Sequence, residues 1–468
     1  MSNGLNLPLP RVAPPLDAQF RPAAIANRAF RAAVSRSGRG VPLAVALERG
    51  DGSISTVRTE VFASGADGAE QNLPYAERLV KFLLWQRGGW RVIVGGPPEV
   101  GQHLQRAYAA GGIRAFDADF MGGVYEHPFT VEVTDADRVP DTREGTTPLG
   151  RHLDGCRIGL DVGASDYKVA AVVDGEDVFS EETVWDADPK LQSDPVYHYE
   201  RFLGAVRRAA EHLPRVDAIG VSSAGVYIDN RVRVASVFRG VPKDAFEAQV
   251  ADIYLEVGRA LGEIPLVAVN DGEVAALAGS MALEANAVLG IALGSSEAGG
   301  YVTPEGNITG WLNELAFCPI DYHPEAPLDE WSGDRGAGVQ YLSQVGAIRL
   351  ATAGGLELPD ATPAERLVVI QDRHAAGDER ARGVFESIGS YLGYAIAHYA
   401  GFYDLQHVLI LGRVTSREGG PVIEAQAVRV LQEEFPELVG TIKLHLPDET
   451  SRRVGQAVAA ASLPYVSR

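Results

Sequence analysis

Three short segments of the chain place glycine, hydroxyl or carboxylate side chains directly after an apolar run. In the first, GLDVGASDYKVAAVVDGE, Asp161 ends the run and Gly163 and Ser165 form a turn before Lys168. Backbone amides in a small-residue turn can approach phosphate oxygens, and a carboxylate at a strand end can hold Mg²⁺ through water. The segment indicates either a nucleotide phosphate loop or an ordinary hairpin whose turn Asp161 caps.

The second segment, VAVNDGEVAALAG, carries Asn270 and Asp271 between an apolar strand and a helix. Phosphoryl transfer to an alcohol needs a carboxylate that accepts the alcohol proton, and a neighbouring amide can orient the same substrate. Asp271 would be this general base and Asn270 its companion. The alternative interpretation is that the pair only caps the helix.

The third segment, VLGIALGSSEAGGYV, places Gly294, Ser295 and Ser296 after another apolar strand. A second amide-rich turn that faces the first could bind the β and γ phosphates from the opposite side. A plain tight hairpin explains the same residues, so this segment alone leaves both interpretations open.

The elements around these segments predict several domains, because 468 residues exceed what one hydrophobic core usually serves. Residues 1–40 read as an arm with one helix. Two strands, a helix, a strand and a helix then predict a small α/β accessory domain that ends in a polar linker, over residues 41–150. Strands and helices alternate through the remainder, which predicts two α/β lobes around a cleft, residues 151–280 and 281–468.

Composition excludes several classes of partner. The chain has 42 basic and 62 acidic residues, a formal net charge of −20, which repels nucleic acids and anionic membranes. The sequence has no apolar run of membrane-spanning length, and its first residues do not resemble a secretory signal, so we expect a cytoplasmic protein. Cys156 and Cys318 lie far apart in the sequence and indicate neither a disulfide scaffold nor a thiolate metal cluster.

Taken in this order, the segments resemble the ROK (repressor, open reading frame, kinase) family over nearly all of residues 156–468. GLDVGASDYK is similar to the family's first phosphate loop and VDAIGVSSAGVYIDNRV to its sugar-approach strand and turn. LVAVNDGEVAALAG resembles the catalytic Asn-Asp segment, and GIALGSSEAGG the second phosphate loop. The resemblance implies an α/β, two-lobed actin-like (ribonuclease H-like) ATPase fold, here with an additional N-terminal α/β domain, and ATP-dependent phosphorylation of a sugar hydroxyl.

The resemblance also implies roles for individual residues. Asp271 would be the catalytic base, and the substrate-binding residues would be Ser223, Gly225, Asn270 and Glu314. Mg²⁺ would be held by Asp161 through water. The partners would be a small-molecule sugar and a nucleotide, and the protein would be a homodimer. ATP would contact Asp161, Gly163, Ser165, Lys168, Gly294, Ser295, Ser296, Gly412 and Arg413.

The chain departs from the family pattern in the segment that follows Glu314. Phe317 stands where the family has a histidine that serves sugar or zinc. Glu330, Ser332 and Ala337 occupy the places of three zinc-binding cysteines, and these side chains cannot replace thiolates, so we expect no structural zinc. Packing through Trp331 and Tyr341 would hold the loop instead.

Two further departures concern the nucleotide. Arg413 takes the place of a glycine in HVLILGRVTSREGG, where it could clash with adenine or stack on it. Glu297 would bring a negative charge close to the phosphates. These departures favour an alternative function, a catalytically impaired sugar- or nucleotide-binding sensor. A DNA-binding repressor is a weaker alternative, because residues 1–150 show no basic recognition helix.

Overall fold

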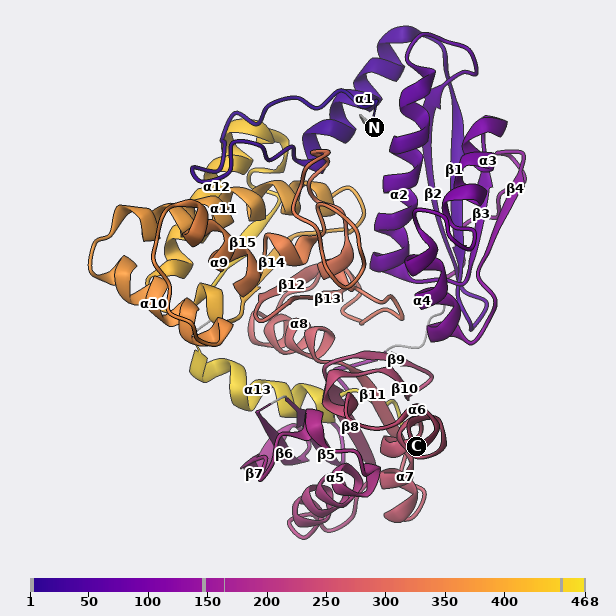
Figure 1. The fold of residues 1–468 in the computed structure, drawn as a ribbon. Coiled ribbons are helices and arrows are strands. Elements are labelled where there is room, and N and C mark those ends of the chain that lie inside the picture. The colour runs from indigo at the N-terminus through magenta and orange to yellow at the C-terminus, as the bar shows by residue number, and fades with distance from the viewer. Residues whose placement is uncertain (1–3, 145–148, 164, 447–448, 467–468) are drawn as a thin grey trace.

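The computed structural model describes residues 4–144, 149–163, 165–446 and 449–466, so Ala164 of the first turn and linker residues 145–148 lie outside it. Figure 1 shows three α/β bodies, with the accessory domain at the right, the N-terminal lobe below and the C-terminal lobe at the left. None of the described helices combines the length and apolar character that a membrane span requires.

The N-terminal arm packs on the C-terminal lobe before the chain enters the accessory domain (Figure 1). The backbone amides of Val12 and Leu16 donate to the hydroxyls of Tyr394 and Ser387, which lie on helix α11 (Glu379–Tyr399). Helix α1 (Ala23–Ser37) follows and ends at Gly38, which adopts a left-handed conformation with φ 61°. Hydrogen bonds to α11 therefore attach the arm to the C-terminal lobe.

The accessory domain is a four-stranded sheet with three helices. Its strands, in the order β2-β1-β3-β4, pair antiparallel except for the parallel β3–β4 pair. Helix α4 and strand β4 were not predicted from sequence, since α4 contains two glycines and lacks a side-chain cap. The elements are β1 (Gly40–Glu48), β2 (Ile54–Phe62), α2 (Asn72–Arg87), β3 (Arg91–Gly95), α3 (Pro98–Ala107), α4 (Ala115–Tyr125) and β4 (Thr130–Thr134).

The N-terminal lobe contains a five-stranded sheet in the order β11-β8-β5-β6-β7. The last helix, α13 (Glu449–Ala461), returns to this lobe and packs on β5 and β8. A Cβ at Gly159 would lie 1.8 Å from the carbonyl oxygen of Ala457, so only glycine permits this approach. The other elements are β5 (Cys156–Val162), β6 (Asp166–Val173), β7 (Glu176–Val184), α5 (Pro195–Ala210), β8 (Ala218–Ser223), β9 (Val226–Ile228), β10 (Arg231–Val234), α6 (Lys243–Ala245), α7 (Ile253–Ala260) and β11 (Leu266–Asn270).

The C-terminal lobe contains a four-stranded sheet in the order β13-β12-β14-β15, and helix α8 packs on β12 and β13. The sheet of each lobe contains an antiparallel hairpin, β5–β6 or β12–β13, whose first strand pairs parallel with a later strand. The predicted phosphate turns are the turns of these two hairpins. The elements are α8 (Asp271–Ala282), β12 (Val288–Leu293), β13 (Glu297–Val302), α9 (Gln344–Ala353), α10 (Pro363–Ala375), α11, β14 (His407–Leu411), α12 (Gly419–Glu434) and β15 (Lys443–His445).

The hydrophobic cores divide the molecule differently from the sequence order. One core runs without interruption from the accessory domain into the C-terminal lobe, joining residues such as Trp85 of α2 to Tyr399 of α11. The N-terminal lobe has a core of its own around Phe202. The accessory domain and the C-terminal lobe therefore form one packed unit.

Candidate functional site

Three carboxylates from distant parts of the chain meet between the lobes. Asp161 lies near the end of β5, Asp271 begins α8, and Glu314 precedes the 3-10 turn Leu315–Phe317. Burial, together with the nearby charge of Asp161, raises the pKa of Asp271 to about 6. Burial and the charge of Asp271 raise the pKa of Glu314 to about 7. Asp271 therefore lies close enough to Asp161 and to Glu314 to feel the charge of one and to act on the other.

Asn270 fixes the geometry beside this cluster. Its side-chain oxygen accepts from the amide of Gly272 at 2.7 Å, and its side-chain nitrogen donates to the carbonyl of Gly225 at 2.8 Å. Asn270 therefore caps helix α8, as the alternative interpretation held, and also holds the turn after β8. Strand pairing places Asn270 directly opposite Ser223. The structure brings Ser223, Gly225, Asn270 and Asp271 together at one end of the sheet.

The first predicted phosphate turn is closed by a hydrogen bond from the amide of Gly163 to the carbonyl of Asp166, at 2.9 Å. Ser165 is exposed at its tip. Lys168 lies opposite Asp161 in the strand pair and forms an ion pair with Asp166 at 3.0 Å. Ser222 donates to Asp161 at 2.6 Å, yet burial keeps the pKa of Asp161 above its usual value.

The second predicted turn lies against the segment that follows β14. The amide of Gly294 donates to the carbonyl of Ser296 at 2.9 Å, and Ser295 and Ser296 are exposed. A Cβ at Gly412 would lie 2.4 Å from the carbonyl oxygen of Leu293, and φ at Gly412 is 97°, so this position requires glycine. Arg413 follows with an exposed side chain. The structure therefore brings Gly294, Ser295, Ser296, Gly412 and Arg413 together.

The expectation that Glu297 brings charge to the phosphates is wrong. Its side chain points into the core, where only 2% of the residue is exposed, and the hydroxyl of Tyr399 donates to it at 3.1 Å. Burial raises the pKa of Glu297 to about 8, so this carboxyl is mainly protonated at pH 7. The physical reason is that β13 begins at Glu297, whose side chain faces the core, whereas Ser296 is still in the exposed turn.

The loop that contains Glu330, Ser332 and Ala337 is held in part by the predicted packing. Trp331 contacts the rings of Phe116, Phe120 and Phe317, and the hydroxyl of Tyr341 donates to Asp321 at 2.6 Å. Phe317 also packs on Trp85, with 4.4 Å between the ring centroids. Phe317 is thus part of an aromatic contact with the accessory domain.

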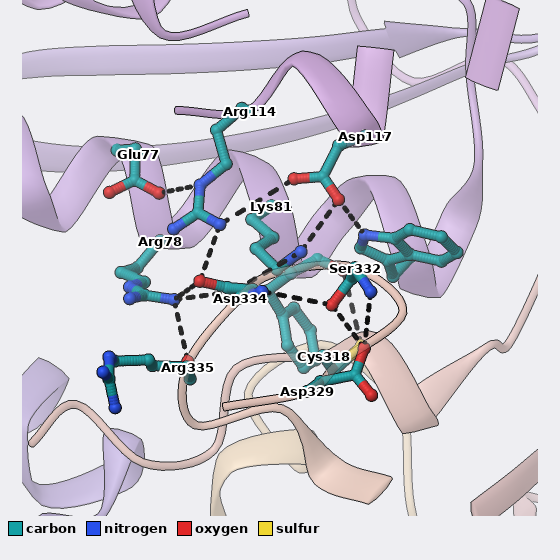
Figure 2. A network of polar contacts seen from close by, with 12 residues as sticks. Glu77, Arg78, Lys81, Arg114, Asp117, Cys318, Asp329, Ser332, Asp334 and Arg335 are labelled. Atoms are coloured by element: carbon teal, nitrogen blue, oxygen red, sulfur yellow. Dashed lines mark hydrogen bonds and ion pairs between the residues drawn. The ribbon is translucent and has the colours of Figure 1, made fainter. Parts of the chain in front are cut away.

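A buried ion cluster, which sequence reasoning missed, completes the attachment of this loop (Figure 2). Asp334 contacts Arg114 at 2.8 Å, Arg78 at 3.0 Å and Lys81 at 3.5 Å. Burial alone would raise the pKa of Asp334, but these three cations lower it well below its usual value. The charged residues on the apolar helix α2 were a signal for the cluster. The cluster consists of Glu77, Arg78, Lys81, Arg114, Asp117 and Asp334, all at most 8% exposed.

No group of three metal-binding side chains is close enough to hold an ion by itself, as far as the described residues go. The ion cluster and the aromatic contacts now connect the loop to the accessory domain. The accessory domain therefore supports this loop with buried charges and aromatic rings.

A cavity of about 980 Å³ lies where the three bodies meet. Gly225 and Asn270 line it from the N-terminal lobe, whereas Asp271, Ser223 and Glu314 lie outside its lining. Arg87 lines it from the accessory domain and stacks on Trp311 of the C-terminal lobe, with the guanidinium carbon 4.4 Å from the ring centroid. Sequence reasoning did not identify Arg87 or Trp311, because neither belongs to a recognisable motif.

Comparison with known proteins rests on structure, since no family model matches the chain and no curated protein matches its sequence. A ROK family transcriptional regulator, described as a homologue of the E. coli MLC protein, is 19% identical with a TM-score of 0.53. The match covers 66% of this chain and 79% of that one. A ROK hexokinase from Thermus thermophilus is 18% identical with a TM-score of 0.51, over 65% of this chain and 96% of that one. At these identities the likeness establishes the fold.

Proposed function

We propose that this chain, which shares the two-lobed actin-like ATPase fold with those structures, is an ATP-dependent kinase that phosphorylates a sugar hydroxyl. The α/β fold predicted from sequence is confirmed. The observation that supports the activity most is the meeting of Asp161, Asp271 and Glu314 beside the fixed amide of Asn270. A kinase of this kind needs one carboxylate at the acceptor hydroxyl and another at the metal.

The residues present fit a nucleotide with Mg²⁺. The hairpin turns of both lobes expose hydroxyls, at Ser165 in one and at Ser295 and Ser296 in the other. Asp161 lies beside the first turn, and its carboxylate is the kind of ligand that a hard cation prefers, with phosphate oxygens and water as the remaining ligands. When bound, MgATP would supply the phosphoryl group and a positive charge among these oxygens.

The chain's own residues would then position the acceptor. Asp271 would accept the proton of the sugar hydroxyl as that oxygen attacks. The amide of Asn270, held by two hydrogen bonds, would restrict the orientation of the same sugar. Glu314 would accept a hydrogen bond from a second hydroxyl, and Ser223 would border the ring. Closure of the lobes would exclude water from this reaction.

The direct test is magnesium-dependent ADP formation by the full-length protein with a panel of hexoses. The Asp271→Asn variant should lose at least about 100-fold in kcat, the usual contribution of a general base. Asp244→Asn, at an exposed aspartate of helix α6 in the N-terminal lobe, is the matched control and should retain full activity. Activity of Asp271→Asn within threefold of the wild type would refute the assignment.

The packing of Phe317 favours one alternative, a sensor that binds sugar or nucleotide without turnover. Its ring lies between Trp85 and Trp331, so this position offers packing to the accessory domain where the family offers a polar ligand. Calorimetry with ATP and hexoses, run beside the turnover assay, separates the two functions. Binding without product supports the sensor.

A further inference from the structure

The cavity at the junction of the three bodies is much larger than one sugar ring requires. Its volume of about 980 Å³ lies at the upper end of the range of about 300–1,000 Å³ that small-molecule sites span. Part of its wall comes from the accessory domain, which supplies Arg49, Arg87 and Glu144. A ligand in this cavity would therefore touch a domain that the two-lobed fold does not include.

The cavity shares Asn270 and Gly225 with the proposed sugar site. Asn270 directly precedes Asp271 in the chain and is joined to Gly225 by the hydrogen bond at 2.8 Å, so part of the cavity wall adjoins the proposed catalytic residue. A molecule with one ring at Asp271 could extend past Asn270 into the cavity.

The polar side chains of the wall are held in place before any ligand arrives. The guanidinium of Arg87 stacks on Trp311 and donates to the carbonyl of Phe402 at 3.1 Å. Glu144 accepts from Arg49 and from the indole nitrogen of Trp311. Planar donors and acceptors held in this way suit a ligand with many hydroxyl groups, because these side chains lose little conformational entropy when the ligand binds.

The charge of the lining determines which polyhydroxyl compounds fit. Among the described residues, two arginines line the cavity together with six carboxyl side chains, Asp51, Glu144, Asp229, Glu273, Glu305 and Asp404. This excess of carboxylates disfavours a phosphorylated or otherwise anionic sugar.

We propose that the cavity binds the distal rings of an uncharged oligosaccharide or glycoside, whose terminal ring is the acceptor. The inference rests on the proposed function for the acceptor role, whereas binding in the cavity can be measured without turnover. The preferred substrates would then be longer than a monosaccharide.

Gly310 offers a way to fill the cavity without disturbing the fold. It lines the cavity, is exposed, and a Cβ there would meet no atom within 4 Å. In Gly310→Trp the indole would occupy the cavity. Gly123→Trp is the matched control, since Gly123 is equally open but lies on α4 outside the cavity lining.

The experiment is calorimetry on the full-length Asp271→Asn protein with glucose, maltotriose, cellotriose, chitotriose and glucose 6-phosphate. At least one trisaccharide should bind ten times or more tighter than glucose. Gly310→Trp should weaken that trisaccharide at least tenfold and glucose less than twofold, whereas Gly123→Trp should change neither. Arg87→Gln should weaken the trisaccharide selectively and serves as the second variant.

Several results would overturn the inference. Glucose could bind as tightly as every trisaccharide, glucose 6-phosphate could bind best, no member of the panel could bind, or Gly310→Trp could leave trisaccharide binding intact. Kinase activity on monosaccharides together with any of these results would leave the proposed function standing. Selective trisaccharide binding by a protein without kinase activity would support the inference about the cavity and contradict the proposed function.

Discussion

The ion cluster under the accessory domain and the carboxylate cluster between the lobes use the same kinds of side chain in opposite ways. In the ion cluster, three buried cations accompany three buried carboxylates, and the pKa of Asp334 is lowered. Between the lobes, Asp161, Asp271 and Glu314 lie together, and the pKa of each is raised. Lys168, a cation that lowers the pKa of Asp161, is already paired with Asp166.

The difference indicates which region holds the molecule together and which is available for ligands. Balanced buried charges bind two bodies to each other, and the continuous core around Trp85 does the same. The carboxylates between the lobes have no matching cations in the part of the chain that the structure describes and lie at the boundary of two separate cores, so a bound cation would stabilise their charged forms. We therefore expect the accessory domain to move with the C-terminal lobe, and the N-terminal lobe to move against both.

The largest effect should come from the balanced cluster. Asp334→Asn would leave Arg78, Lys81 and Arg114 buried without their shared partner, which should lower the free energy of unfolding by about 3–5 kcal/mol. Urea unfolding of the full chain measures it. An unfolding midpoint equal to that of the wild type would show that the cluster does not hold the accessory domain.

Asp271→Asn should have the opposite pattern. Among the described residues no cation forms an ion pair with this carboxylate, so the variant should unfold at or above the wild-type midpoint while kcat falls at least about 100-fold. Thermal unfolding and the kinase assay on one preparation check both statements. A loss of stability as large as that of Asp334→Asn would erase the distinction between the two regions.

Glu297 is a further buried carboxyl that pairs with no cation of the described segments, and its raised pKa should make the stability of the protein depend on pH. Its folded pKa of about 8 exceeds the unfolded value of about 4.3, so rising pH removes the proton from the unfolded chain first. The wild type should lose up to about 1.4 kcal/mol per pH unit from this group between pH 5 and pH 8. Glu297→Gln, which cannot titrate, should become steadily more stable relative to the wild type over that window. A constant difference between the urea midpoints of the wild type and Glu297→Gln at pH 5, 6, 7 and 8 would contradict the assignment.

The smallest effect should come from an ion pair at the surface. Arg208 contacts Glu181 at 2.8 Å, with side chains that are 42% and 34% exposed. Arg208→Ala should therefore change the free energy of unfolding by about 0.5 kcal/mol or less. Urea unfolding beside Asp334→Asn shows whether burial, rather than pairing as such, makes the ion cluster strong.

Local chemistry was enough to predict the turns and the residues that follow each strand. Asp161, Asn270 and Asp271 stand at strand ends because an apolar run and a turn signal sit next to each other in the sequence, and such neighbours need no tertiary structure to be recognised. The two-lobed fold could also be predicted, since strands and helices alternate throughout residues 156–468. Capping the helix and lying beside the proposed catalytic residue were alternative interpretations of Asn270, and the structure shows that its side chain does both.

Tertiary packing alone decided the rest. Arg87 meets Trp311 and Asp334 meets Arg78 across more than 200 residues, and no pattern within either segment specifies such a partner. The return of α13 to the N-terminal lobe and the large cavity depend in the same way on how whole elements pack. The physical reason is that turns and caps are formed by neighbouring residues, whereas cavities and buried ion pairs exist only where distant surfaces meet.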